Sequence, residues 1–439
     1  MNIAKLKVPK YEDSISKSII HEALLSPNFL NQEEGILKLP KTDPLAFIKY
    51  KLLNENIQDS FLVGDLGAVY KMFKLWKTHL PDVVPFYAVK SNPDKMLIKL
   101  MIELGMSFDC ASKKEIQTIL KHNISTNRII YANPCKQLNH LKYAKEVNVR
   151  KMTFDNIDEL IKIYIHYPNA ELFLRILPLD CHSKVPFSSK FGAELEACRQ
   201  LLQSAKDFNL NVVGLSFHVG SDCLDPEGYK ETIRRARIIY DQAKSVGFNL
   251  SILDIGGGFP GIKNVEQFIK IAKVVNLSLN DYFKDANLTF IAEPGRFFAA
   301  SFYTLATTVI GKRVCYNDSE EKSIMYYLND GVFKSFSEGA FIPEILYEPK
   351  LLFRNGLYLP EITEQNLQFC TLWGPALGAK DKINTDSNLR LPELELNDWL
   401  YFENMGAYST CFNMEFNGFE QPLKFYVNTE ADELLRLLF

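Results

Sequence analysis

Between residues 61 and 301 the chain alternates short apolar runs with amphipathic stretches of helix length. Nine apolar runs predict strands, at residues 60–63, 85–89, 107–110, 129–132, 151–154, 172–176, 212–217, 252–255 and 289–292. The stretches between them have helical periodicity, at residues 64–80, 94–104, 113–121, 156–166, 193–208, 226–246 and 265–283. This alternation predicts a parallel sheet covered by helices, and about eight units in roughly 240 residues suit a TIM-type (β/α)8 barrel. A doubly wound sheet satisfies the same pattern, so alternation alone leaves both α/β folds open.

The rhythm changes after residue 301. Strands are predicted at residues 304–311, 323–328, 369–373, 399–403 and 423–428, with few helix-length periods among them. A chain of 439 residues is long for one hydrophobic core, so two domains are expected. We therefore expect the barrel at residues 46–301 and a mostly β domain at 302–439, with residues 1–45 joining the β domain.

Composition excludes several classes of protein. The net charge of -3 gives no basic surface for nucleic acid or an anionic membrane. The eight cysteines form no CxxC pair and the seven histidines no HExxH-type spacing, so neither a disulfide framework nor a metal site is expected. Residues 1–14 contain charges and no apolar run, which argues against a signal peptide or membrane anchor. We expect a cytoplasmic enzyme that binds neither nucleic acid nor membrane.

Lys90 ends the apolar run 86–89 and is followed by Ser91, Asn92 and Pro93. On a barrel this position places the amine at the carboxyl end of a strand, where barrel active sites lie. A partly desolvated lysine there can form a Schiff base with an aldehyde cofactor. Taken alone, such a lysine is usually a surface residue, so the interpretation needs the other motifs.

Three glycines, Gly256, Gly257 and Gly258, follow the apolar run 252–255. Glycines after a strand let backbone N–H groups approach a phosphate closely. The spacing GGGxxG, interrupted by Pro260 and followed by no long helix, does not fit a dinucleotide-binding turn. A glycine turn with no ligand stays open for this motif by itself.

Two more strand ends carry polar side chains. Glu293 could keep a pyridine nitrogen protonated, which makes the ring an electron sink, and Arg296 could pair with a phosphate through its planar fork. His218, after residues 214–217, could stack on a flat ring. A local Glu–Arg ion pair and a structural histidine are the alternatives. In this order, and with Lys90 and the glycine turn, the set indicates a pyridoxal 5'-phosphate (PLP) pocket.

With these motifs the chain resembles eukaryotic ornithine decarboxylase, in the PLP-dependent alanine racemase-like barrel family. The resemblance spans roughly residues 60–428. Further matching strings lie at residues 108–112, 131–137, 190–193, 329–332, 403–408 and 416–419. It implies an amino-acid substrate, a PLP barrel with a β domain that contributes to the active site and dimer interface, and a head-to-tail homodimer with shared active sites.

The resemblance also assigns roles to residues. Lys90 would be the Schiff-base lysine, His218 would stack on the pyridine ring and Glu293 would bind its nitrogen, so these three are the catalytic candidates. The phosphate would be held by Ser221, Gly256, Gly257, Gly258, Arg296 and Tyr408. The lysine and the ring would be surrounded by Asp109, Glu115 and Arg175.

The chain departs from its relatives where they handle the substrate. Relatives carry a Cys-Asp pair, delivered from the partner subunit, where this chain has Leu377 and Gly378. They carry an aspartate at Ile342. The two aspartates receive the distal ammonium of ornithine, and losing a buried charge partner costs roughly 3–5 kcal/mol. Ornithine and lysine are therefore poor substrate candidates. The expected substrate pocket is Phe341, Ile342, Leu377, Gly378 and Phe416.

The missing cysteine has a separate consequence. In the family it protonates Cα after CO2 leaves, which Leu377 cannot do. Protonation by water or another side chain would give an amine, whereas protonation of the cofactor carbon would give an aldehyde and an aminated cofactor. Cys370 could replace the donor only in a different alignment register.

Three hypotheses follow: a decarboxylase retuned to another amino acid, an inactive paralogue acting as a regulatory partner as antizyme inhibitors do, and an ordinary ornithine decarboxylase of polyamine synthesis. The complete set of cofactor positions favours the first. An apolar wall would suit a bulky substrate group, whereas Lys334 or Lys380 could receive a carboxylate. A carboxylate-bearing substrate is compatible with the loline-alkaloid member of the family, which acts on an amino-carboxypropyl proline.

Overall fold

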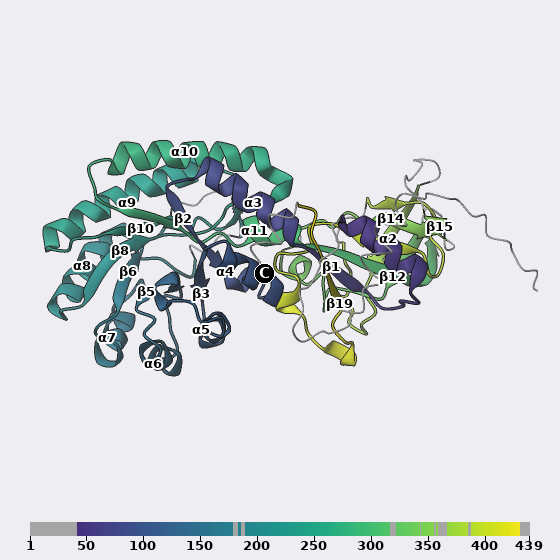
Figure 1. Ribbon diagram of the computed structural model, residues 1–439, viewed down its shortest axis with the longest axis horizontal. Helices are drawn as coiled ribbons and strands as arrows, with labels where there is room; N and C mark the ends of the chain where they lie inside the picture. Colours follow the sequence, from purple (N-terminus) through teal and green to yellow (C-terminus); the bar gives the residue numbers. More distant parts are fainter. Residues whose placement is uncertain are drawn as a thin grey trace, which may run out of the picture.

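The computed structural model describes residues 42–178, 183–185, 189–316, 322–342, 344–354, 357–358, 367–384 and 388–430. These residues form a barrel at one end of the molecule and a β domain at the other (Figure 1). The fold expected from the sequence, a TIM-type barrel plus a mostly β domain, is confirmed, and the doubly wound alternative is wrong. Residues 1–41 lie outside the described part, so most of the expected N-terminal segment is not placed.

Eight parallel strands close the barrel, because the last strand pairs with the first. In chain order they are β2 (Val83–Ala88), β3 (Ser107–Cys110), β4 (Ile129–Tyr131), β5 (Lys151–Phe154), β6 (Glu171–Arg175), β8 (Asn211–Ser216), β10 (Ile252–Asp254) and β11 (Thr289–Ala292). The barrel interior is filled by apolar side chains, among them Phe86, Ile130, Phe173 and Ile291. The barrel is therefore a packed core with its polar groups at the strand ends.

Helices surround the barrel, as Figure 1 shows. They are α3 (Leu66–His79), α4 (Lys95–Glu103), α5 (Lys113–Leu120), α6 (Leu138–Glu146), α7 (Ile157–His166), α8 (Leu195–Asp207), α9 (Pro226–Val246), α10 (Val265–Phe283) and the short α11 (Arg296–Ala299). The bounds of α9 follow from its sequence: Asp225 caps the first turn, Pro226 occupies the first position, and Gly247 ends the helix at φ 93°.

The β domain is a nine-stranded sheet within the described residues. Its strands are β1 (Phe61–Asp65), β12 (Tyr303–Tyr316), β13 (Lys322–Leu328), β14 (Lys350–Arg354), β15 (Leu357–Tyr358), β16 (Gln368–Trp373), β17 (Arg390–Leu391), β18 (Trp399–Phe402) and β19 (Leu423–Val427). Helix α2 (Pro44–Asn54) packs on this sheet through Phe47 and Ile48. A short helix, α12 (Glu338–Phe341), follows β13. Outside both sheets, β7 (Ser183–Val185) pairs with β9 (Ser221–Cys223).

Strand β1 belongs to the β domain, although its sequence suggested the first strand of the alternating region. It pairs antiparallel with β12 and parallel with β19. All five of its residues are buried, so its burial pattern is that of a barrel strand, and only its pairing assigns it to the other sheet. From residue 42 onwards the described chain thus begins in the β domain, runs through the barrel and returns.

No helix in the described part of the chain is long and apolar enough to cross a membrane.

Candidate active site

The carboxyl ends of the barrel strands converge on one pocket between the barrel and the loops of the β domain. Lys90 follows β2 in a short 3-10 helix (Val89–Ser91), His218 follows β8 and Glu293 follows β11. The residues that line the pocket are Ala88, Lys90, His218, Ser221, Asp222, Gly258, Phe259, Glu293, Gly295, Arg296 and Tyr408. Seven of these eleven were expected at a cofactor site from the sequence. The motifs, up to 318 residues apart in the chain, therefore meet in space.

The amine of Lys90 is paired with a buried carboxylate. Its Nζ lies 2.7 Å from Asp109 Oδ2; the Asp109 side chain is fully buried, while that of Lys90 keeps 36% of its accessible surface. Burial alone would lower the pKa of the amine, but the charges of Asp109 and Glu293 outweigh it and raise that pKa. Asp109 therefore holds the lysine in place, charged and within reach of the pocket.

Two buried carboxyl groups, those of Asp254 and Glu293, lie at the ends of the adjacent strands β10 and β11. Burial raises the pKa of Asp254 to about 7. Burial also raises the pKa of Glu293, and the Asp254 charge raises it further. Asp254 Oδ1 accepts from Gly256 N at 2.9 Å. The two carboxyl groups can hydrogen-bond to each other when one is protonated, and Asp254 Oδ2 and Glu293 Oε1 accept from no other donor among the described residues. Because both pKa values are raised, the two carboxyl groups retain a proton. A basic nitrogen placed beside Glu293 could share that proton.

The imidazole of His218 is kept neutral. Burial lowers its pKa well below the usual range, and the charges of Arg175 and Lys90 lower it further. Its Nδ1 accepts a hydrogen bond from Gly220 N at 3.0 Å. The ring lies against the glycine turn, because a Cβ on Gly257 would come within 2.7 Å of His218 Nε2. A neutral, flat ring is thus fixed at the pocket wall.

The glycine turn is required by the close approach of two strand-end loops. A Cβ on Gly256, at φ 64°, would lie 1.9 Å from Phe217 O, and one on Gly258, at φ 105°, 2.6 Å from Gly220 O. Any side chain there would separate the loop after β10 from the loop after β8. The turn therefore needs glycine for this close packing, and Gly258 lines the pocket; its binding of a phosphate stays a prediction.

Arg296, Ser221 and Tyr408 form the other end of the pocket. Arg296 Nη2 lies 3.5 Å from Ser221 Oγ, and the guanidinium lies 5.1 Å from the centre of the Tyr408 ring. Tyr408 has φ 53°, a conformation that costs a non-glycine residue energy, and its N–H donates to Ser91 O at 2.8 Å. This bond joins the β-domain loop to the segment that carries Lys90.

Glu115 and Arg175 were expected around the lysine and the ring. Glu115 Oε2 accepts from Ala111 N at 2.6 Å, and burial raises the pKa of its carboxyl group. Arg175, at the end of β6, lies 5.1 Å from the Phe191 ring; burial lowers its pKa, which the charge of Glu293 opposes. Its Nε is buried with no hydrogen-bond partner in the part of the chain that the structure describes.

The expected substrate-pocket residues fall into two groups. Phe341 at the end of α12 contacts Phe412 at 5.3 Å between ring centres, and Phe412 stacks on Tyr408 at 6.2 Å. Ile342 follows Phe341 and donates its N–H to Glu338 O. This group therefore borders the chain's own cofactor pocket.

The second group gathers around Phe416. Phe333 stacks on Phe416 at 4.6 Å, and a Cβ on Gly378 would lie 2.8 Å from the Phe333 ring. Leu377 donates its N–H to Asn417 Oδ1 at 2.9 Å, and 90% of its accessible surface is exposed. Because Leu377 is so exposed, this second group of residues lies at the surface of the single chain.

Two other residues considered from the sequence are occupied elsewhere. Cys370 is buried in β16, where it pairs with Ile324 of β13. Lys334 is buried near the carboxylate of Asp330. Burial raises the pKa of Asp330, and the positive charge of Lys334 partly opposes this rise. Lys380 is exposed. Neither a Cys370 proton donor nor a Lys334 carboxylate receptor therefore fits these positions.

Sequence reasoning missed three acidic residues at the site, Asp222, Asp254 and Glu338. Asp254 had a signal, since it directly precedes the glycine turn at a strand end. Asp222 follows Ser221 and lines the same pocket. Nothing in the sequence around Glu338 indicated a role at the site. Its contact with Arg296 arises only because the β domain packs against the barrel.

The residues fit three functional groups of PLP: the pyridine nitrogen, the phosphate and the aldehyde. The unpartnered Glu293 Oε1 suits the pyridine nitrogen, and the buried Arg296 Nε, also without a partner in the described residues, suits a phosphate oxygen beside Ser221 and the glycine turn. Lys90 suits the aldehyde carbon. Fold and pocket together define a PLP-dependent barrel enzyme.

Comparison with known proteins narrows this class. The family model "Pyridoxal-dependent decarboxylase, pyridoxal binding domain" matches residues 66–300. Antizyme inhibitor 2 of Xenopus laevis is 42% identical over 92% of this chain and 89% of its own length, and ornithine decarboxylase of Mus musculus 40% identical over 84% and 81%. The crystal structure of the Paramecium bursaria Chlorella virus arginine decarboxylase bound to agmatine is 35% identical, with a TM-score of 0.81, and the match covers 87% of this chain and all of the viral one. The chain belongs to the ornithine decarboxylase-like family of PLP-dependent carboxy-lyases.

Proposed function

We propose that this protein is a PLP-dependent amino-acid decarboxylase whose substrate is not ornithine. The observation that carries the proposal is a contrast between the cofactor side and the substrate side of the active site. The cofactor residues Lys90, Glu293 and Arg296 converge on one pocket, while the positions expected to receive the substrate's distal group carry no acid: Phe341, Ile342, Leu377 and Gly378.

The chain's own residues have defined tasks in this proposal. PLP, when bound, supplies a ring that accepts the electron pair left behind as CO2 departs. Glu293 would share a proton with the pyridine nitrogen, and burial raises the pKa of its carboxyl group in the protein without cofactor. Neutral His218 would pack on the ring without adding a charge to it, and Asp109 orients the Lys90 amine. The site therefore supports decarboxylation whatever the substrate's far end.

The apolar positions Phe341 and Ile342 argue against a distal ammonium. A terminal ammonium that met them without a counter-charge would lose roughly 3–5 kcal/mol relative to a site with its aspartate. A bulky or uncharged group fits this wall. A carboxylate is the other option, and the exposed Lys380 stays available for it. A carboxylate-bearing substrate of alkaloid metabolism, such as the loline-type proline conjugate, belongs to this second option.

The product depends on where the proton goes after CO2 leaves. Leu377 stands where the family's cysteine donates to Cα, and its side chain has no proton to give. Protonation of Cα by water would give an amine. Protonation of the cofactor carbon instead, followed by hydrolysis, would release an aldehyde and leave the substrate's amino group on the cofactor. Both products are part of the proposal, and mass spectrometry separates them.

Homodimerisation is also part of the proposal. Leu377 and Phe341 expose 90% and 65% of their surfaces in the single chain, and Phe416 is exposed beside Leu377's loop. Apolar side chains exposed to this degree around a site are typical of a protein interface. A second copy that covers them would complete each pocket with residues from both subunits. We place the dimer in the cytoplasm.

The test uses the purified protein loaded with PLP. Its visible absorbance is recorded, then CO2 and products are measured with ornithine, lysine, arginine and a carboxyl-bearing proline conjugate. We expect the absorbance of PLP linked to Lys90 and CO2 from an amino acid other than ornithine. Lys90→Ala should release no CO2 and lose the absorbance that comes from the lysine linkage. Ornithine turnover typical of the family would contradict the substrate proposal and support an ordinary ornithine decarboxylase.

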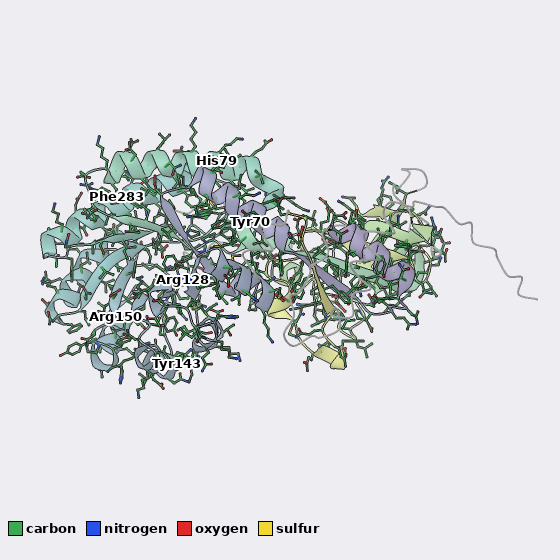
Figure 2. All side chains as sticks on the ribbon, in the orientation of Figure 1. Tyr70, His79, Arg128, Tyr143, Arg150 and Phe283 are labelled. Carbon is green, nitrogen blue, oxygen red and sulfur yellow. The ribbon has the colours of Figure 1, made fainter. Side chains whose placement is uncertain are left out.

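A regulatory role is the second candidate, because a relative 42% identical is an antizyme inhibitor. A specific surface favours it as well: Ile157, Ile161, Tyr164 and Ile165 form an exposed apolar stripe on α7. Helix α7 lies on the part of the barrel away from the β domain (Figure 1), and the labelled Tyr143 and Arg150 lie on the barrel as well (Figure 2). If the role is antizyme binding, Ile161→Asp with Ile165→Asp weakens antizyme capture and leaves PLP binding unchanged. If this variant captures antizyme as well as the wild type does, the stripe has no role in antizyme binding.

A further inference from the structure

The carboxylate of Glu338 binds the guanidinium of Arg296 across the boundary between the two domains. Arg296 begins α11 in the barrel, whereas Glu338 begins α12 in the β domain. Arg296 Nη1 donates to Glu338 Oε2 at 3.1 Å, and Nη2 donates to Glu338 Oε1. Both side chains are largely buried, with 15% and 8% of their accessible surfaces exposed. The ion pair is therefore bidentate and little screened by solvent.

The adjacent edge of the same guanidinium faces the pocket. Arg296 Nη2 also approaches Ser221 Oγ at 3.5 Å. Arg296 Nε is buried and has no hydrogen-bond partner in the part of the chain that is described. A guanidinium has two edges that can bind an oxyanion in a bidentate manner. Glu338 takes the Nη1–Nη2 edge, which leaves the Nε–Nη2 edge turned towards Ser221.

Glu338 is itself held in position. Ser337 Oγ donates to Ser409 O at 3.0 Å, which fastens the start of α12 to the loop that carries Tyr408. Gly339 N donates to Tyr347 Oη at 3.0 Å. Beyond the ion pair lies a cavity of about 290 Å³ that both Arg296 and Glu338 line. A guanidinium released by Glu338 would therefore have room to turn away from Ser221.

We propose that Glu338 is a positioning residue, which holds Arg296 so that its Nε–Nη2 edge binds the phosphate of the cofactor. The inference rests on the proposed assignment of Arg296 to the phosphate. It also links two functions of α12, because the helix that begins at Glu338 ends at Phe341 in the substrate wall. The grip on the phosphate and the position of the specificity residues are then set by one short element.

The experiment compares two ligands that differ only in the phosphate, PLP and pyridoxal. Dissociation constants of both are measured by absorbance titration for the wild type and for Glu338→Ala, Glu338→Gln, Arg296→Gln and Glu344→Ala. Glu344 is the matched control, because it lines the same cavity and is exposed. Thermal unfolding and sedimentation verify that each variant keeps its fold and assembly.

We expect Glu338→Ala to weaken PLP at least about tenfold, as loss of one charge-assisted hydrogen bond at the phosphate would. Pyridoxal affinity should stay unchanged, Glu338→Gln should recover part of the loss, and Glu344→Ala should resemble the wild type. Unchanged or tighter PLP binding in Glu338→Ala would overturn the proposal, since Glu338 would then be idle or a competitor of the phosphate. If Arg296→Gln also treats both ligands as the wild type does, the phosphate assignment of Arg296 is the part that fails.

Discussion

The residues of the site depend on carboxyl groups whose protonation is set by burial. Asp254 and Glu293 both have raised pKa values because they are removed from water and lie close to each other. Paired carboxyls of this kind titrate as a unit. The arrangement reserves a proton beside Glu293 for a pyridine nitrogen. It also gives the protein without cofactor a pH dependence with a definite sign.

That sign can be tested with Asp254→Asn. An unfolded carboxyl titrates near pH 4 and folded Asp254 near 7, so the folded state binds more protons in between. Its stabilising contribution is present in full below about pH 4 and is lost as the pH rises through about 7, on the order of a few kcal/mol. Urea unfolding of the cofactor-free protein at pH 5 and pH 8 should show this loss reduced in Asp254→Asn. The exposed carboxyl variant Asp59→Asn should keep the wild-type difference, and an unchanged loss in Asp254→Asn would contradict the account.

A second residue prediction concerns the proton that replaces CO2. Leu377→Cys restores a thiol at the position where the family donates to Cα, so the product should shift towards the amine. Leu377→Ser, of similar size but far weaker acidity, is the control. Because Leu377 is exposed in the single chain, the cost in folding stability should stay within about 0.5 kcal/mol. The ratio of amine to aldehyde in the products, read by mass spectrometry, decides; an unchanged ratio would place the donor elsewhere.

At the scale of elements, α12 and the residue after it set the far end of the substrate. Ile342→Asp places a carboxylate next to Phe341, where relatives receive an ammonium. We expect kcat/KM for ornithine to rise at least about tenfold, in line with the roughly 3–5 kcal/mol carried by a buried charge partner. Ile342→Asn, of the same size and uncharged, should give no such gain. If both variants behave alike, the segment does not select the distal charge.

The helices and strands show which parts of the fold could be predicted from the sequence. The barrel strands and the bounds of α9 followed from periodicity and caps, because both are local properties. Helix α6 was missed, since only Leu141 and Ala144 of its nine residues are buried. Strand β1 was grouped with the barrel, because a buried strand followed by a helix reads the same in either sheet. Pairing between distant strands is what the local pattern lacks.

The same limit applies inside the site. Lys90 and the glycine turn were predictable from residues at strand ends, and the resemblance supplied Asp109 as a neighbour of the lysine. The Asp254–Glu293 pair depends on β10 lying next to β11, and the Arg296–Glu338 pair depends on how two domains pack. Contacts between elements of this kind become visible only once the chain is folded.

The proposed shared active site requires two copies of the chain. We expect a sedimentation mass of twice the 50.3 kDa chain. Leu377→Asp should weaken the dimer, because it places a charge on an exposed apolar surface that the partner would bury. The matched control is Leu53→Asp, on an exposed leucine of α2. A wild-type monomer that releases CO2 would contradict the shared active site.

Whether this protein is a decarboxylase retuned away from ornithine can be decided by a competition experiment. The PLP-loaded protein is given an equimolar pool of α-amino acids that includes ornithine, lysine, arginine and carboxyl-bearing proline conjugates. The products then report relative kcat/KM in a single vessel. The account predicts CO2 and an amine or aldehyde from a substrate without a distal ammonium, in excess over putrescine. Putrescine as the main product, or no CO2 from protein that has bound PLP, would contradict it.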